Sequence, residues 1–176
     1  MHYEMFRPLI IQGGMGAGVS NWRLARAVSQ MGQLGVVSGT ALDVILVRKL
    51  QEGDPGGELR RAFSRFPIPA IAERILNQYF IPGGKPVEKP YKTIPPASIQ
   101  PGNGAVELMM LANFTEVLLA KEGHAGFVGI NYLHKVQLPM LPSLYGAMLA
   151  GVDFVLMGAG IPMSIPGVLD QFARGE

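Results

Sequence analysis

Three glycine-bearing or amide-bearing segments follow short apolar runs, and these are the places where the sequence predicts chemistry: Gly13–Gly18, Asn131 and Gly158–Gly160. Ligands of parallel α/β folds gather at the carboxyl ends of strands, where loops vary and helix N-termini present N–H groups. Bare glycines at a strand end allow a flat ligand such as a flavin ring to approach the backbone. They also suit a tight structural turn, and spacing alone leaves both interpretations open.

The glycine run does not follow two common phosphate-binding patterns. In G-x-G-x-x-G the third glycine would fall at Val19 or Asn21, so the dinucleotide fingerprint is absent. The lysine of a phosphate-binding P-loop is absent as well. The run therefore suits a flat ligand such as a flavin ring better than a pyrophosphate.

The elements that must position this run form a βαβ unit. Leu9–Gln12 is predicted as a first strand, and Leu34–Val37 as a second. Between them, Ser20 or Asn21 can cap a helix that Gly32 ends. Such a unit places its two strands in parallel with a right-handed crossover.

A similar alternation returns near the end of the chain. Phe127–Ile130 is predicted as a third strand, ending in Asn131. A helix over Leu141–Gly151 and a fourth strand over Val152–Leu156 follow, and a last helix starts near Ser164.

The intervening residues, about 42–123, are far longer than an ordinary βα loop and are predicted as an insertion. Helices are expected over 42–53, 56–66, 69–79 and 106–121. The proline-rich segment Ile81–Pro101 is expected to be an extended surface arm.

Composition narrows the class of protein. The 176 residues are 48% hydrophobic and 16% charged with a net charge of +2, which predicts a folded chain without a nucleic-acid-binding patch. There is no cysteine, and no apolar run reaches the ~18 residues of a membrane span. A cytoplasmic protein that does not bind a membrane is expected. No spacing of acidic or histidine residues indicates a metal site.

Three motifs together resemble the nitronate monooxygenase (2-nitropropane dioxygenase) family. Pro8-Leu9-Ile10-Ile11-Gln12-Gly13-Gly14-Met15-Gly16 is similar to its opening strand. Gly129-Ile130-Asn131-Tyr132-Leu133 is similar to the end of its third strand, and Val155-Leu156-Met157-Gly158-Ala159-Gly160 to that of its fourth. The motifs lie at both ends of the chain.

The resemblance implies an α/β protein of the (β/α)₈ TIM-barrel type that binds FMN. In that family the end of the first strand lies against the flavin. The residues that correspond to it here are Gln12, Gly13, Gly14, Met15 and Gly16. The residue that corresponds to the family's amide after the third strand is Asn131. The family's phosphate loops and catalytic base come from later strands and have no counterpart here. Since a barrel needs about 250 residues, residues 1–176 are expected to be its N-terminal half. The remainder of a barrel or a homo-oligomeric partner would complete it.

The leading hypothesis is an FMN-dependent oxidoreductase that acts on a small molecule such as an alkyl nitronate. One alternative is an FMN-dependent enoyl-thioester reductase; another is a non-catalytic half-barrel or assembly surface. No catalytic residue is identified, and His134, just beyond the third strand, is the one candidate. His124 is expected to favour a helix carboxyl terminus instead. The segment alone is expected to be inactive.

Overall fold

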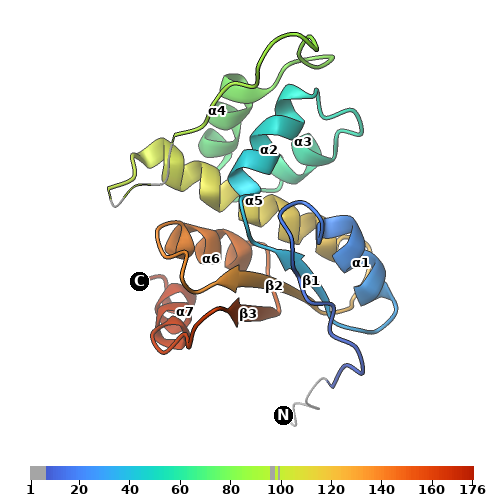
Figure 1. Cartoon of the computed structure of the whole chain (residues 1–176), viewed down its shortest axis with the longest axis vertical. Coiled ribbons are helices and arrows are strands. Elements are labelled where there is room, and N and C mark those ends of the chain that lie inside the picture. The colour runs from blue at the N-terminus through green and yellow to red at the C-terminus, as the bar shows by residue number, and fades with distance from the viewer. Residues whose placement is uncertain (1–6, 96–97, 99) are drawn as a thin grey trace.

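The computed structural model describes residues 7–95, 98 and 100–176, which form a mixed α/β structure around a small parallel sheet (Figure 1). The strands are β1 (Gly35–Ser38), β2 (Val128–Leu133) and β3 (Phe154–Gly158). The helices are α1 (Trp22–Gln30), α2 (Leu42–Gln51), α3 (Glu58–Phe63), α4 (Pro69–Tyr79), α5 (Asn103–Lys121), α6 (Met140–Leu149) and α7 (Ile165–Arg174).

The sheet has the strand order β1-β2-β3, and both pairings are parallel. The expected first strand, Leu9–Gln12, is reduced to one parallel bridge between Ile11 and Leu34. Pairing stops there because Val36 N, the next donor of β1, is bound by the side-chain oxygen Gln12 Oε1 (2.9 Å) instead of by a backbone carbonyl. The prediction of a full strand was therefore wrong, although its position beside β1 and its direction were right.

Two strands end later than the sequence indicates. β2 continues through Asn131 to Leu133, and β3 includes Gly158. The reason is visible in the backbone, where Gly39 N donates to Asn131 O (2.9 Å) and His134 N donates to Gly158 O (2.8 Å). These bonds extend the pairing past the apolar residues, so Asn131 lies within a strand rather than after it.

α1 begins where the sequence predicts. Asn21 Oδ1 accepts from the backbone N–H groups of Arg23 (3.0 Å) and Leu24 (3.2 Å). This is an N-cap, which satisfies donors that the first turn leaves unpaired. Gly32, with a φ of +73°, ends the helix as expected.

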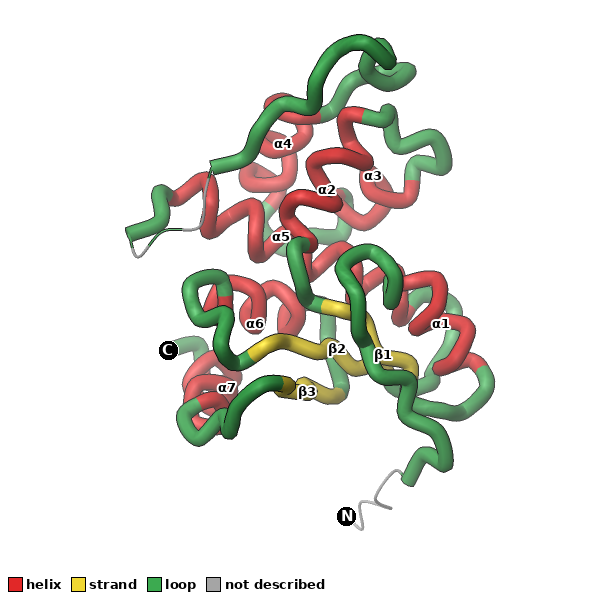
Figure 2. The backbone as a smooth tube through the Cα atoms, in the orientation of Figure 1, coloured by secondary structure: helices red, strands yellow, loops and turns green. Residues whose placement is uncertain are grey.

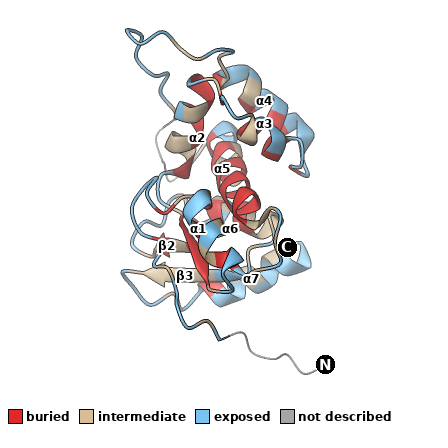
Figure 3. Ribbon diagram, turned by 90° about the vertical axis from the view of Figure 1, so that its right-hand side faces the viewer, coloured by how far each residue is buried: buried red, intermediate tan, exposed pale blue. Residues whose placement is uncertain are grey.

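α5 is the central helix of the molecule. It packs against α2, α3 and α4 on one side and against α1, α6 and the sheet on the other (Figures 1 and 3). Every residue over 111–120 is buried. α5 is thus the crossover helix that connects β1 to β2. The segment inserted into this βαβ unit consists of α2–α4 and the arm that follows them (Figure 2).

The two faces of the sheet differ. Side chains alternate along a strand, and the hydrophobic core takes Val37, Ile130 and Val155 from one face. The alternate residues Val36 and Leu156 are not part of that core cluster. Parallel sheets usually have both faces covered; here the helical core covers one.

The arm, Ile81–Pro101, is largely exposed over its described residues, as the sequence predicts; residues 96, 97 and 99 lie outside the described part. It is nevertheless anchored. Gln51 Oε1 accepts from Lys92 N (2.7 Å), and Gln51 Nε2 donates to Lys92 O (3.3 Å). This side chain mimics the pairing that a neighbouring strand would supply.

Over the described ranges, no helix is long and apolar enough to cross a membrane.

Candidate functional site

The glycine loop, defined here as Gly13–Gly18, is fixed to the sheet by Gln12 and Ser20. Gln12 Oε1 accepts from Val36 N (2.9 Å), while Gln12 Nε2 donates to Ser20 Oγ (2.9 Å). Ser20 Oγ in turn donates to Met15 O (2.7 Å). Gln12, which the resemblance assigns to the cofactor, thus uses both the oxygen and the nitrogen of its amide to hold the loop in place.

Asn131 holds the same loop from β2. Its Nδ2 donates to Gly13 O (2.9 Å) and lies 3.4 Å from the Met15 sulfur. Its Oδ1 is buried and has no hydrogen-bond partner among the described residues. A Cβ built on Gly158 would lie 3.9 Å from this oxygen. The three motifs singled out in the sequence therefore meet at one place, at the carboxyl ends of the strands.

Gly14 lies flat against the sheet. A Cβ built on it would overlap Val36 Cγ1 and lie 2.9 Å from Asn131 Cβ. A side chain at this position would therefore collide with the protein itself rather than enter ligand space. The need for glycine here arises both from this close approach and from the positive φ.

A cleft of about 180 Å³ opens beside the glycine loop. Its walls come from the loop, the end of β1 and the end of β2: Gly14, Met15, Gly16, Ala17, Ser38, Thr40, Asn131 and Leu133. Met15 is 61% exposed, and the hydroxyl-bearing Ser38 is buried. Gln12 and Gly13 do not line the cleft, although Gly13 O is the group that Asn131 holds.

The backbone of the glycine loop presents unused donors. Within the described residues, none of the N–H groups from Gly13 to Gly18 donates to another backbone group. Unpaired N–H groups are satisfied by water or by a ligand. The loop that lines the cleft therefore carries N–H groups without a backbone partner, whereas Asn131 Oδ1 is enclosed by the protein.

These features fit a flat ring with polar edges, such as a flavin ring system. The residues offer close backbone approach and loop N–H groups that have no backbone partner. No lysine or arginine lines the cleft, so a phosphate group would find no charged partner there. The fit therefore extends to the ring and not to the phosphate end of FMN.

The two histidines near the strands differ in position. His134 directly follows β2 and lies beside the end of β3, where a Cβ built on Gly160 would overlap the His134 side chain; it does not line the cleft. His124 follows α5: its Nε2 lies 2.7 Å from Ala120 O, and its Nδ1 accepts from Gly126 N (3.0 Å). His124 thus serves the helix end, as the sequence indicates.

Sequence reasoning missed Ser20, Ser38 and Thr40. The sequence suggests Ser20 only as a possible helix cap. Asn21 performs that role, and the Ser20 hydroxyl supports the glycine loop instead. Ser38 and Thr40 follow directly on the second apolar run, so their place after a predicted strand was the available signal.

Among the described residues, no group of three acidic or histidine side chains could hold a metal ion. Comparison with protein-family models, curated proteins and solved structures found no match to this chain.

Proposed function

We propose that this chain forms the flavin-ring side of an FMN-dependent oxidoreductase similar to nitronate monooxygenases. The observation that carries the proposal is the hydrogen bond from Asn131 Nδ2 to Gly13 O (2.9 Å), beside an unpartnered Asn131 Oδ1. It joins two of the motifs that resemble the family, and Gly158 of the third lies next to them.

In this proposal the chain's residues bind and orient the ring. Gln12 and Ser20 hold the loop in one conformation, which would lower the cost of binding a ligand. Asn131 fixes the loop from the other side. Bound FMN would supply the capacity to accept and release electrons.

We further propose that the sheet is part of a (β/α)₈ barrel. Strands that are sequential neighbours and parallel, with the core on one face, are the pattern of such barrels. The face that carries Val36 and Leu156 would then point to the barrel interior, and the segment bridged at Ile11 would be its first strand. The phosphate anchor and the catalytic base would come from strands beyond these residues, since no cleft residue is suited to either task.

The test is to purify the protein, release any chromophore by denaturation and identify it. The proposal expects FMN, held without a covalent bond. Protein that takes up no FMN when refolded with excess flavin would overturn it. In a barrel completed by the strands that supply the base, oxygen consumption with a small alkyl nitronate, compared with enoyl-thioester reduction by a nicotinamide cofactor, then separates the two oxidoreductase activities.

A further inference from the structure

A groove of about 270 Å³ lies between α2 and the arm, on the side of α5 that faces away from the sheet (Figure 1). Its α2 wall consists of Val44, Val47 and Arg48, which share one face of the helix because side chains three and four positions apart are neighbours. Residues 91–94 of the arm form the opposite wall. No residue of the described chain lines both this groove and the cleft beside the glycine loop, so the two are separate features.

The arm forms a fixed wall of the groove. Gln51, which is buried, binds the backbone N–H and C=O of Lys92 with its side-chain amide (2.7 and 3.3 Å). The backbone oxygen of Gln51 also accepts from Lys85 N (2.7 Å), and the Tyr91 hydroxyl donates to Glu52 Oε1 (2.6 Å). These bonds join the arm to the C-terminal end of α2 before any ligand binds, which lowers the cost of binding one.

Part of the groove lining is apolar. Val47 is buried, and Ile94 packs against the hydrophobic core while remaining partly buried. Val44 beside them is half-buried. An apolar side chain in the groove would cover these residues, and both surfaces would gain free energy by leaving water.

Arg48 adds a positive charge that no carboxylate neutralises. Most arginines of the described chain form ion pairs, as Arg74 does with Glu107 (2.7 Å), but Arg48 forms none with a described residue. Its guanidinium lies 5.4 Å from the centre of the Tyr91 ring. Its N–H donors are therefore available to a carboxylate, which a guanidinium binds through two hydrogen bonds at once.

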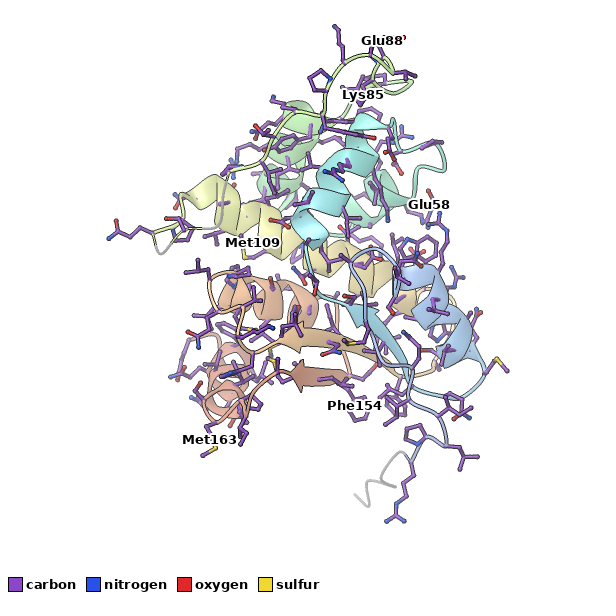
Figure 4. All side chains as sticks on the ribbon, in the orientation of Figure 1. Glu58, Lys85, Glu88, Met109, Phe154 and Met163 are labelled. Carbon is purple, nitrogen blue, oxygen red and sulfur yellow. The ribbon has the colours of Figure 1, made fainter. Side chains whose placement is uncertain are left out.

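The positive charge continues along the arm, in lysines that also form no ion pair with a described residue: Lys85, Lys89 and Lys92. Two carboxylates lie in the same region, those of Glu52 and Glu88, so positive charge is in excess there. Figure 4 shows Lys85 and Glu88 at the outer end of the molecule, in the arm. Because the cations are spread over several residues, a partner needs more than one anionic group to complement them.

We propose that this groove docks an acidic segment of a partner protein, with one apolar side chain against the valines of α2 and a neighbouring carboxylate on Arg48. An acidic peptide supplies both groups, whereas a nucleic acid supplies anionic groups without an apolar side chain. The groove lies outside the cleft beside the glycine loop, so this inference does not depend on the flavin site.

The experiment measures the fluorescence anisotropy of a fluorescein-labelled peptide in which one leucine lies between runs of aspartate and glutamate. The whole chain should bind this peptide. Replacing the leucine by serine, or the acidic residues by their amides, should weaken binding at least tenfold. Absence of binding, or equal binding of the three peptides, would overturn the proposal. Tighter binding of a single-stranded oligonucleotide than of the leucine peptide would overturn it as well.

Two pairs of variants locate the binding, with circular dichroism as the check on folding. Arg48→Gln should weaken binding of the leucine peptide about tenfold, because a charge-assisted hydrogen bond is lost. Arg7→Gln removes the same charge from an exposed arginine near the N-terminus and should leave binding unchanged. Thr93→Trp fills the groove and should abolish the preference for leucine over serine, whereas Val87→Trp, at a 90% exposed arm residue outside the groove, should keep it. Equal behaviour within either pair of folded variants would contradict the assignment.

Discussion

The amide nitrogen of Asn131 donates to the carbonyl oxygen of Gly13 (2.9 Å), joining residues 118 positions apart. Because Gly13 begins the glycine loop and Asn131 lies in β2, this bond ties the loop to the middle strand of the sheet. Asn131→Leu should destabilise the protein by about 1–3 kcal/mol, since it leaves the Gly13 carbonyl without its donor. Hydrogen exchange should quicken over the glycine loop. Asn21→Ala, which removes the α1 cap at a cost of about 1 kcal/mol, should leave that loop's exchange slow; equal quickening in both variants would show that Asn131 has no special hold on it.

Gly14 and Gly13 provide a matched pair of glycines. Gly14→Ala should cost about 1–3 kcal/mol, because its Cβ would meet Val36 and Asn131 at a positive φ. Gly13→Ala should change stability by less than about 0.5 kcal/mol, since the nearest foreign atom to its Cβ is Met15 Cγ at 3.6 Å. Urea denaturation measures both. Similar stability of the two variants would contradict the close packing at Gly14.

The buried carboxyl of Glu116 on α5 should make stability depend on pH. Burial raises its pKa, and the charge of Lys49, the hydrogen bond from Trp22 N and the charge of Arg23 act against this. The folded protein therefore holds this proton to a higher pH than the unfolded chain does, and the contribution to stability falls as pH rises above about 4.5. Glu116→Gln keeps an acceptor for Trp22 N (2.7 Å) and cannot ionise, so it should raise Tm at pH 7 and have less effect near pH 4.

Glu122 is a control for Glu116, because its pKa is shifted in the opposite direction. Its hydrogen bond with Arg61 lowers its pKa, so its contribution to stability is present above about pH 4.5 and is lost on acidification. Glu122→Gln should lower Tm at pH 7. A rise in Tm for both variants would show that removal of negative charge, rather than burial, governs the result.

The anchor between Gln51 and the arm predicts a pattern of proteolysis. Lys85 and Lys89 precede prolines, so Lys92-Thr93 is the trypsin site of the described arm residues. Gln51 binds both backbone groups of Lys92. Gln51→Leu should speed cleavage at this site several-fold, whereas Gln171→Leu, at an exposed position on α7, should not. Unchanged cleavage in the Gln51 variant would mean that other contacts hold the arm.

The sequence predicts most of the helices because their signals are local. Asn21 caps α1, and α4 begins at Pro69, where a proline fits the first turn. The strand ends are predicted less well, because the pairing of Asn131 with Gly39 and of Gly158 with His134 depends on segments far apart or on loop geometry.

The sequence predicted that three motifs come together, but it did not predict what each of their residues contacts. The motifs at Gly13, Asn131 and Gly158 do meet. That Gln12 supports the loop rather than lining the cleft follows from its bonds to Val36 and Ser20, which exist only in the folded chain.

The central claim is that the cleft beside the glycine loop holds the ring of FMN, and a titration of FMN against two tryptophan variants tests it most directly. Ala17 is exposed and lines the cleft; Ala125 is exposed and lies in the loop before β2, at the opposite end of the strands. With flavin fluorescence as the readout, Ala17→Trp should weaken FMN binding at least tenfold, and Ala125→Trp should bind FMN like the unaltered protein. FMN binding that is equally strong in both variants would contradict the account.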